Sequence, residues 1–286
     1  MKKTHRFLKK ILKILLFLVI LAAASSSAWK YLLEKQKTSG FVTSFYQIQS
    51  EKLSDRMRIA LLSDLHLKEY GEKNKDLLER IQQLKPDLIA VAGDMNLEEN
   101  EDDHVVTELC TNLLEIAPVY YVMGNHEWQA KIEYGQSIGE DIESTGVNVL
   151  NDRWEEIEIN GNTIKIGGLT EAPMHYEKYG KGFFENFEKE DGFKLLLTHY
   201  PEYFLGELEN ADIDVAMCGH AHGGQMRIPG VGGLYTKDQG WFPKLTEGVQ
   251  QINGISVVIS RGLGDSSEIP RINNPAELVI VDLNWY

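Results

Sequence analysis

The fold is indicated by one stretch of the sequence, Arg58-Ile59-Ala60-Leu61-Leu62-Ser63-Asp64-Leu65-His66. It begins as an apolar run of strand length and ends in a carboxylate and an imidazole. Two further apolar runs follow at residues 87–92 and 119–122, and the stretches between the three runs, 73–84 and 104–116, have a helical pattern. Alternation of strands and helices predicts an α/β unit with parallel strands.

Polar residues of a few kinds follow the ends of these apolar runs and of two later ones. The later runs, at 195–197 and 215–217, lead to Thr198-His199 and to Gly219-His220-Ala221-His222. Ligands of open α/β sheets bind beyond the carboxyl ends of the strands, so residues far apart in the sequence can converge there. The candidate metal ligands are Asp64, His66, Asp94, Asn125, His199, His220 and His222.

These side chains offer carboxylate, amide and imidazole groups without a thiolate. That donor set suits Mn, Fe, Zn or Ni and is poorly matched to Ca or to structural zinc. These side chains are too many for one ion, but they suit two ions that share a ligand. A carboxylate such as that of Asp94 can bridge two ions roughly 3.5–4 Å apart. We therefore expect two divalent metal ions.

The second half of the chain has more β character. Runs at 154–159 and 163–166 flank Asn160-Gly161-Asn162, which is a hairpin signal, and Asn253-Gly254 joins two further strand-like runs. Because no internal repeat is present, we expect one catalytic domain over residues 56–286.

The motifs Asp-x-His, Gly-Asp, Gly-Asn-His-Glu, His and Gly-His-x-His, in this order and spacing, resemble those of the calcineurin-like metallophosphoesterase superfamily. The longer stretch Gly219–Gln225, with Ser260–Gly264 behind it, is similar to a bacterial membrane-associated phosphodiesterase branch. The resemblance covers residues 58 to about 275. It implies a four-layer αββα sandwich.

The resemblance also implies a metal-dependent phosphoesterase that cleaves diesters in preference to monoesters. One ion is expected at Asp64, His66 and His222, and the second at Asn125, His199 and His220, with Asp94 bridging. In such a site, in-line attack by a hydroxide shared between the ions cleaves the ester. The implied role of His126 is to stabilise or protonate the leaving oxygen.

One part of the pattern departs from the family. The usual Gly-Asp-x-x-Asp ends in an aspartate that helps to orient the catalytic histidine, whereas this chain has Leu97 at that place. Asn96 and Glu98 are the neighbours that could substitute for it after a shift of the loop.

The net charge of −14 conceals an asymmetry. Residues 1–30 hold seven of the 29 Lys and Arg residues and no acid, which leaves 22 basic against 43 acidic residues downstream. A body this acidic is a poor candidate for binding nucleic acid. The two cysteines, Cys110 and Cys218, make no disulfide framework, and Cys218 is expected to be a buried free thiol.

The basic N-terminus is followed by an unbroken apolar run at 14–24. Two readings stay open: a retained single-pass membrane anchor and a signal peptide that is cleaved, which releases the protein. Both place the catalytic domain on the outer side of the membrane. We expect residues 31–55 to be a linker behind the N-terminal segment 1–30.

Other readings of the site and its surroundings also stay open. The activity could be that of a phosphoprotein or nucleotide phosphatase, or the chain could bind metal without turnover. Arg261 could form a structural ion pair or bind phosphate. Aromatic residues that could line a substrate cleft are Tyr70, Trp128 and Trp241, whereas His104 and His175 are expected to be no ligands.

Overall fold

The computed structural model describes residues 27, 30–31, 40–99, 102–170, 173, 176–267 and 269–285. The predicted hydrophobic segment at 14–24 and His175 lie outside these residues. Within them, no helix has both the length and the apolar character that a membrane crossing requires.

Two six-stranded mixed sheets form the centre of the molecule. The first contains, in spatial order, β1 (Phe41–Gln49), β16 (Ala276–Asn284), β2 (Met57–Leu62), β3 (Leu88–Ala92), β4 (Val119–Val122) and β5 (Asn148–Val149). The second contains β14 (Gly248–Ile252), β15 (Ile255–Ile259), β9 (Val215–Cys218), β8 (Phe193–Thr198), β7 (Asn162–Leu169) and β6 (Arg153–Ile159). The central strands of each sheet are parallel: β2, β3 and β4 in the first, and β7, β8, β9 and β15 in the second.

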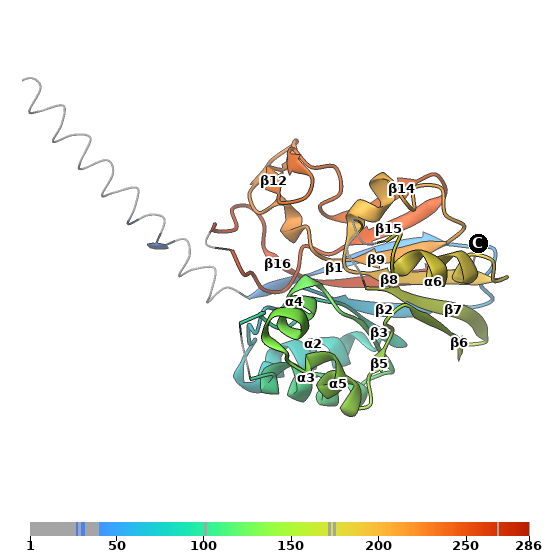
Figure 1. The fold of residues 1–286 in the computed structure, drawn as a ribbon, viewed down its shortest axis with the longest axis horizontal. Coiled ribbons are helices and arrows are strands. Elements are labelled where there is room, and N and C mark those ends of the chain that lie inside the picture. Colours follow the sequence, from blue (N-terminus) through green and yellow to red (C-terminus); the bar gives the residue numbers. More distant parts are fainter. Residues whose placement is uncertain are drawn as a thin grey trace, which may run out of the picture.

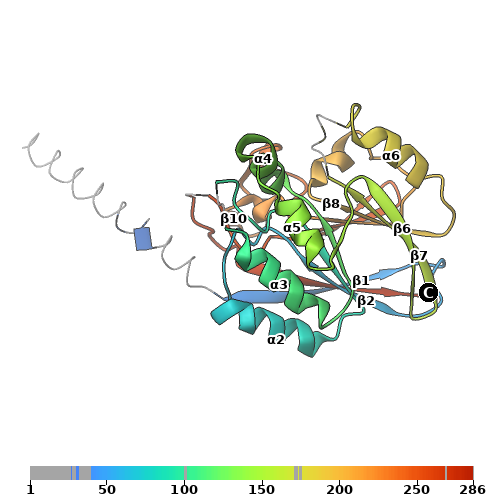
Figure 2. The same ribbon diagram turned by 60° about the horizontal axis from the view of Figure 1, so that its bottom comes forward.

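Helices cover the outer faces of the two sheets. The first sheet carries α2 (Lys75–Leu84), α3 (His104–Leu114), α4 (Asn125–Tyr134) and α5 (Ile138–Ser144), and the second carries α6 (Gly180–Phe187). Figures 1 and 2 show α2, α3 and α5 on the side of the molecule opposite to α6. Three separate apolar cores fill the spaces between the layers, one between the sheets and one under each set of helices. The molecule is therefore a four-layer αββα sandwich.

Strand β3 shows how the sequence produces these layers. All five of its residues are buried. Leu88, Ala90 and Ala92 enter the core between the sheets, whereas Ile89 and Val91 enter the core under the helices. Successive side chains of a strand point to opposite faces, so a continuous apolar run is what a strand covered on both faces requires.

The predicted strands and helices between residues 57 and 122 are present, and so are the hairpin of β6 with β7 and the pair of β14 with β15. The second half of the expected linker differs, because Phe41–Gln49 is β1 and pairs in parallel with β16 along its whole length. As an edge strand, β1 has half-exposed side chains and lacks the continuous apolar run that marks the central strands.

Candidate metal centre

All seven predicted ligands lie at one end of the sandwich, just past the ends of strands. Asp64 and His66 follow β2, Asp94 follows β3, Asn125 begins α4 after β4, His199 follows β8, and His220 and His222 follow β9. The loops are joined by backbone hydrogen bonds, from Asp64 N to Gly93 O at 2.9 Å and from Gly219 N to His199 O at 3.1 Å. Both sheets therefore contribute to one cluster.

Asp64, His66 and His222 form the first group that could hold a metal ion, with all three ligand atoms within 4.8 Å of one another. The Nε2 atoms of His66 and His222 are 3.3 Å apart. The Nε2 atom of His222 lies 3.4 Å from Oδ1 of Asp64. This group has the same three residues that the resemblance assigns to the first ion.

Asp94, His199 and His220 form a second group that meets the same limit. Nε2 of His199 lies 3.1 Å from Oδ2 of Asp94 and 3.1 Å from Nδ1 of His220. Asp94 also belongs to a third group, with His66 and His126. Its carboxylate therefore lies between the two sides of the cluster, which is the position that a bridging ligand needs.

Hydrogen bonds on the outer side of two histidines fix which ring nitrogen faces the cluster. Nδ1 of His199 donates to the carbonyl of Ala92 at 2.7 Å and leaves Nε2 toward Asp94. Nε2 of His220 lies 2.6 Å from Oδ2 of Asp238, so Nδ1 faces the cluster. Carboxylates and carbonyls commonly hold metal-binding histidines in this way.

The backbone is strained at five of the candidate ligands. Their φ angles are positive, a conformation that residues other than glycine seldom adopt. The values are 52° at Asp64, 47° at His66, 54° at Asp94, 65° at His220 and 45° at His222. Such strain costs of order 1–3 kcal/mol per residue and is concentrated at functional sites. Neighbouring glycines make room for the carboxylates, since a Cβ at Gly124 would collide with Asp94 and one at Gly219 with Asp64.

The charges of the buried cluster suit cation binding. Burial lowers the pKa of His66 to about 3, so that its ring is neutral and keeps a lone pair. Burial opposes ionisation of Asp94, but the charge of His199 overcomes it and holds the pKa of Asp94 well below its usual value. Burial opposes protonation of His199, but the Asp94 carboxylate raises the pKa of His199 to about 10, so a metal ion bound there would displace the ring proton.

The side chain of Asn125 gives a separate indication that the site suits a cation. Its side-chain oxygen Oδ1 is buried and accepts no hydrogen bond from the described residues. A buried polar atom without a partner is costly, and a bound cation would satisfy this oxygen. The residues present therefore fit a metal ion beside Asn125.

His126 lies beside the cluster, next to the Asp94 carboxylate. Its backbone N–H donates to Oδ1 of Asp94 at 2.9 Å, and Nε2 of its ring is 3.7 Å from Oδ2 of Asp94. Nδ1 of the ring contacts the Glu98 carboxylate. A hydrogen bond of 3.3 Å from Gln136 Nε2 to the carbonyl of Glu98 holds that loop against α4. Glu98 therefore lies where the family's missing aspartate would act on the histidine.

Glu127, which is not among the predicted site residues, supports this part of the site. Its buried carboxylate accepts hydrogen bonds from the backbone N–H groups of Asp94, Met95, Asn96 and Gly124 and from the hydroxyl of Tyr121, at distances of 2.7–3.1 Å. The signal was available, because Glu127 is the last residue of Gly-Asn-His-Glu and stands at the third position of α4, where a carboxylate can cap the helix.

We expect Glu127→Ala to destabilise the protein by about 3–5 kcal/mol, because it leaves several buried donors without an acceptor. Urea unfolding of the variant and of the parent measures the loss. Glu133→Ala, at an exposed position on the same helix, is the matched control and should have almost no effect. Equal midpoints for the two variants would contradict the structural role of Glu127.

The structure also shows where the other candidate residues lie. Arg261 forms an ion pair with Glu277 at 2.9 Å, in agreement with the structural reading. Tyr70 is buried in the helix-side core of the first sheet, and Trp128 packs against that core, whereas Trp241 is 68% exposed. Both cysteines are buried and free, as expected for Cys218.

Comparison with known proteins agrees with the motifs. The family model for calcineurin-like phosphoesterases matches residues 57–224. The chain is 27% identical to the uncharacterized protein YpbG of Bacillus subtilis over 72% of this chain and 76% of the relative. It is 25% identical to the uncharacterized metallophosphoesterase YkoQ of the same organism, over 78% and 82% of the two chains. It is 25% identical to the phosphodiesterase YaeI of Escherichia coli, over 79% and 82%.

The matched region spans β2 to the 3-10 turn His222–Gly224 and so includes every predicted ligand. The family uses divalent metal ions to hydrolyse phosphoesters, and the clusters described above could hold such ions. On this evidence, the chain is a metal-dependent phosphoesterase and belongs to the calcineurin-like phosphoesterase family.

Proposed function

We propose that the chain is a phosphodiesterase that binds two divalent ions through the seven predicted ligands. The observation that carries the proposal is the position of Asp94, whose carboxylate belongs to groups on both sides of the buried cluster. Asp64, His66 and His222 hold the first ion, and Asn125, His199 and His220 the second. Mn, Fe, Zn and Ni all suit this donor set.

The ions, when bound, supply Lewis-acid stabilisation of the phosphate oxygens and lower the pKa of a coordinated water. The protein's own residues have distinct tasks beside them. His126 presents Nε2 toward the leaving oxygen and gives it a proton, while Glu98 holds the opposite ring nitrogen. Because Glu98 fixes the orientation of the ring, it is a positioning residue in this assignment.

The preference for diesters is supported by the name of one relative, the phosphodiesterase YaeI. The proposed position of the enzyme on the outer side of the membrane, anchored or released, is supported by the sequence of the basic and apolar N-terminal segment alone. Phosphodiesters of lipids or of the cell envelope are the substrates that this position would offer.

Metal-dependent turnover of two model substrates tests the proposal. We expect the purified full chain, loaded with Mn, Fe, Zn or Ni, to hydrolyse bis-p-nitrophenyl phosphate faster than p-nitrophenyl phosphate, and to lose both activities in chelator. Faster turnover of the monoester would overturn the diester preference and favour a phosphoprotein or nucleotide phosphatase. Metal binding without turnover of either compound would indicate a binding protein.

A further inference from the structure

Two short hairpins between the metal centre and β14 form a lobe beside the site. The first pairs β10 (Arg227–Ile228) with β11 (Gly232–Gly233), and the second pairs β12 (Tyr235–Thr236) with β13 (Gly240–Trp241). Figure 1 shows β12, and Figure 2 shows β10, at the end of the molecule where α4 begins.

The lobe is tied directly to the candidate ligands. Asp238, in the turn of the second hairpin, lies 2.6 Å from Nε2 of His220. Leu234, between the hairpins, donates its backbone N–H to the carbonyl of Gly224 at 3.2 Å. A surface carried by these hairpins therefore has a fixed position relative to the metal centre.

The lobe exposes several large apolar side chains to solvent. We call them the hairpin surface: Ile228, Pro229, Val231, Tyr235, Trp241 and Phe242. Trp241 is 68% exposed, Val231 61% and Phe242 60%. Grouped exposed apolar residues of this kind mark interaction sites.

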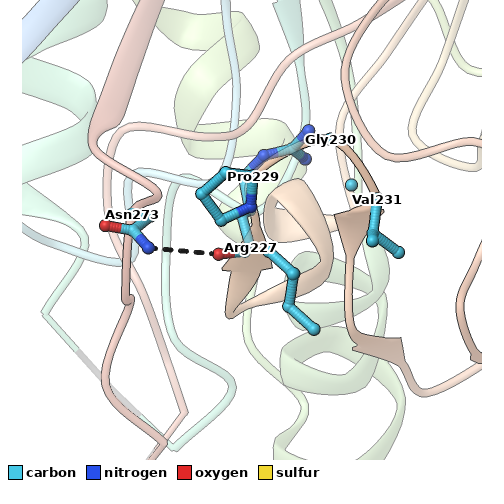
Figure 3. Close-up of a pocket in the computed structure, with 7 residues that line it drawn as sticks. Arg227, Pro229, Gly230, Val231 and Asn273 are labelled. Carbon is cyan, nitrogen blue, oxygen red and sulfur yellow. Dashed lines mark hydrogen bonds between the residues drawn. The ribbon is translucent and has the colours of Figure 1, made fainter.

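The local structure keeps these side chains at the surface. The rings of Tyr235 and Trp241 meet edge to face with their centroids 5.3 Å apart, so the pair presents one broad aromatic face. Pro229 and Val231 border an open pocket of about 390 Å³. Figure 3 shows this pocket, where Asn273 donates to the carbonyl of Arg227 at 3.3 Å and so fixes the first hairpin.

The charge around the hairpin surface is opposite to that of the whole chain. Residues 226–247 contain three basic and two acidic residues, or +1, in a protein of net charge −14, and Arg227 is paired with Glu247. The second acid is Asp238, which contacts His220. Lys237 and Lys244 are exposed, and neither forms an ion pair with the described residues. Exposed Trp, Tyr and Phe beside Lys are typical of segments that lie in the headgroup region of anionic bilayers.

We propose that the hairpin surface docks the catalytic domain on an anionic lipid bilayer. The apolar rings enter the headgroup region, and the two lysines pair with lipid phosphates. Since Asp238 joins the second hairpin to His220, docking places the metal centre beside the headgroups. Docking itself is inferred from the hairpins alone. That the docked enzyme would act on lipid phosphodiesters rests on the proposed function.

An environment-sensitive fluorophore tests the contact in the full chain. The two native cysteines are buried, so Phe242→Cys provides a single accessible thiol for an NBD label. Tyr179→Cys, at a position 49% exposed just before α6, is the matched control. Both labelled proteins are mixed with vesicles of phosphatidylcholine alone or with phosphatidylglycerol added. The difference between the labels reports on the hairpins even where the N-terminal segment binds every vesicle.

We expect a blue shift and higher NBD emission at position 242, and not at 179, with phosphatidylglycerol present. Lys237→Gln combined with Lys244→Gln should reduce this response by about fivefold or more. No response at 242, or an equal response at 179, overturns docking and leaves a protein partner as the occupant of the surface.

Turnover of bis-p-nitrophenyl phosphate by the same labelled proteins separates this proposal from the proposed function. Normal turnover shows that the label has left the fold intact, so a missing NBD response then counts against docking alone. If the unlabelled parent shows no metal-dependent turnover, the proposed function fails, while the fluorescence result still decides on docking.

Discussion

Replacing Asp94 by asparagine is expected to lower turnover of bis-p-nitrophenyl phosphate by roughly 10³-fold, because the substitution removes the charge that two cations would share under the proposed assignment. The amide keeps the size of the side chain and can still accept the hydrogen bond from His126 N. We expect bound metal, measured by mass spectrometry after desalting, to fall from two ions per chain to one or none.

The control for this variant is Asp191→Asn, which removes the same charge at an exposed position away from the cluster. It should keep both metal content and turnover. If Asp94→Asn retained two ions per chain, the bridging role of Asp94 would be refuted, whatever happened to its activity.

His126→Ala is expected to give the opposite pattern, with metal content unchanged and turnover lowered by about 10²–10⁴-fold. The loss should be larger for a diester with a poor alkyl leaving group than for a p-nitrophenyl ester, since a good leaving group needs little protonation. Steady-state kinetics with both substrates and metal analysis of the same sample measure these effects.

Glu98→Gln is the matched variant for the positioning role, because it keeps the shape of the contact and removes the carboxylate. We expect a smaller loss than in His126→Ala, with the same dependence on the leaving group, since Glu98 acts only through the ring. Loss of both metals in His126→Ala would show that His126 is a ligand. A loss in Glu98→Gln that is equal for all leaving groups would exclude its action on the leaving oxygen.

The fold was predictable where a strand is covered on both faces. Residues 88–92 form an unbroken apolar run, because alternate side chains enter two different cores. The same reasoning missed β1, whose edge position leaves Val42 and Phe45 exposed and breaks the pattern. Its pairing with β16 joins residues more than 230 positions apart, and no local signal in either segment specifies such a partner.

The candidate ligands were predictable because cation chemistry restricts their types, and because parallel strands bring their carboxyl ends to one edge. The residues that support these ligands were harder to predict from the sequence. Asp238 and Glu127 act through hydrogen bonds to His220 and to a loop, and many acidic residues in the sequence have similar surroundings. The substitution at Leu97 shows the limit clearly. Sequence left Asn96 and Glu98 as alternatives, and only the path of the loop puts the Glu98 carboxylate on His126.

Each of the two groups of candidate ligands takes side chains from both sheets. In the first group, His222 follows a strand of the second sheet, whereas Asp64 and His66 follow a strand of the first. In the second group, His199 and His220 belong to the second sheet and Asp94 to the first. Under the proposed assignment, each cation would cross-link the two sheets at this end of the sandwich, in addition to the apolar core that already joins them. Binding of the ions would then add to the stability of the packing between the sheets, because only the folded arrangement brings the ligands together. The proposed site would therefore stabilise the fold at the place where it reacts.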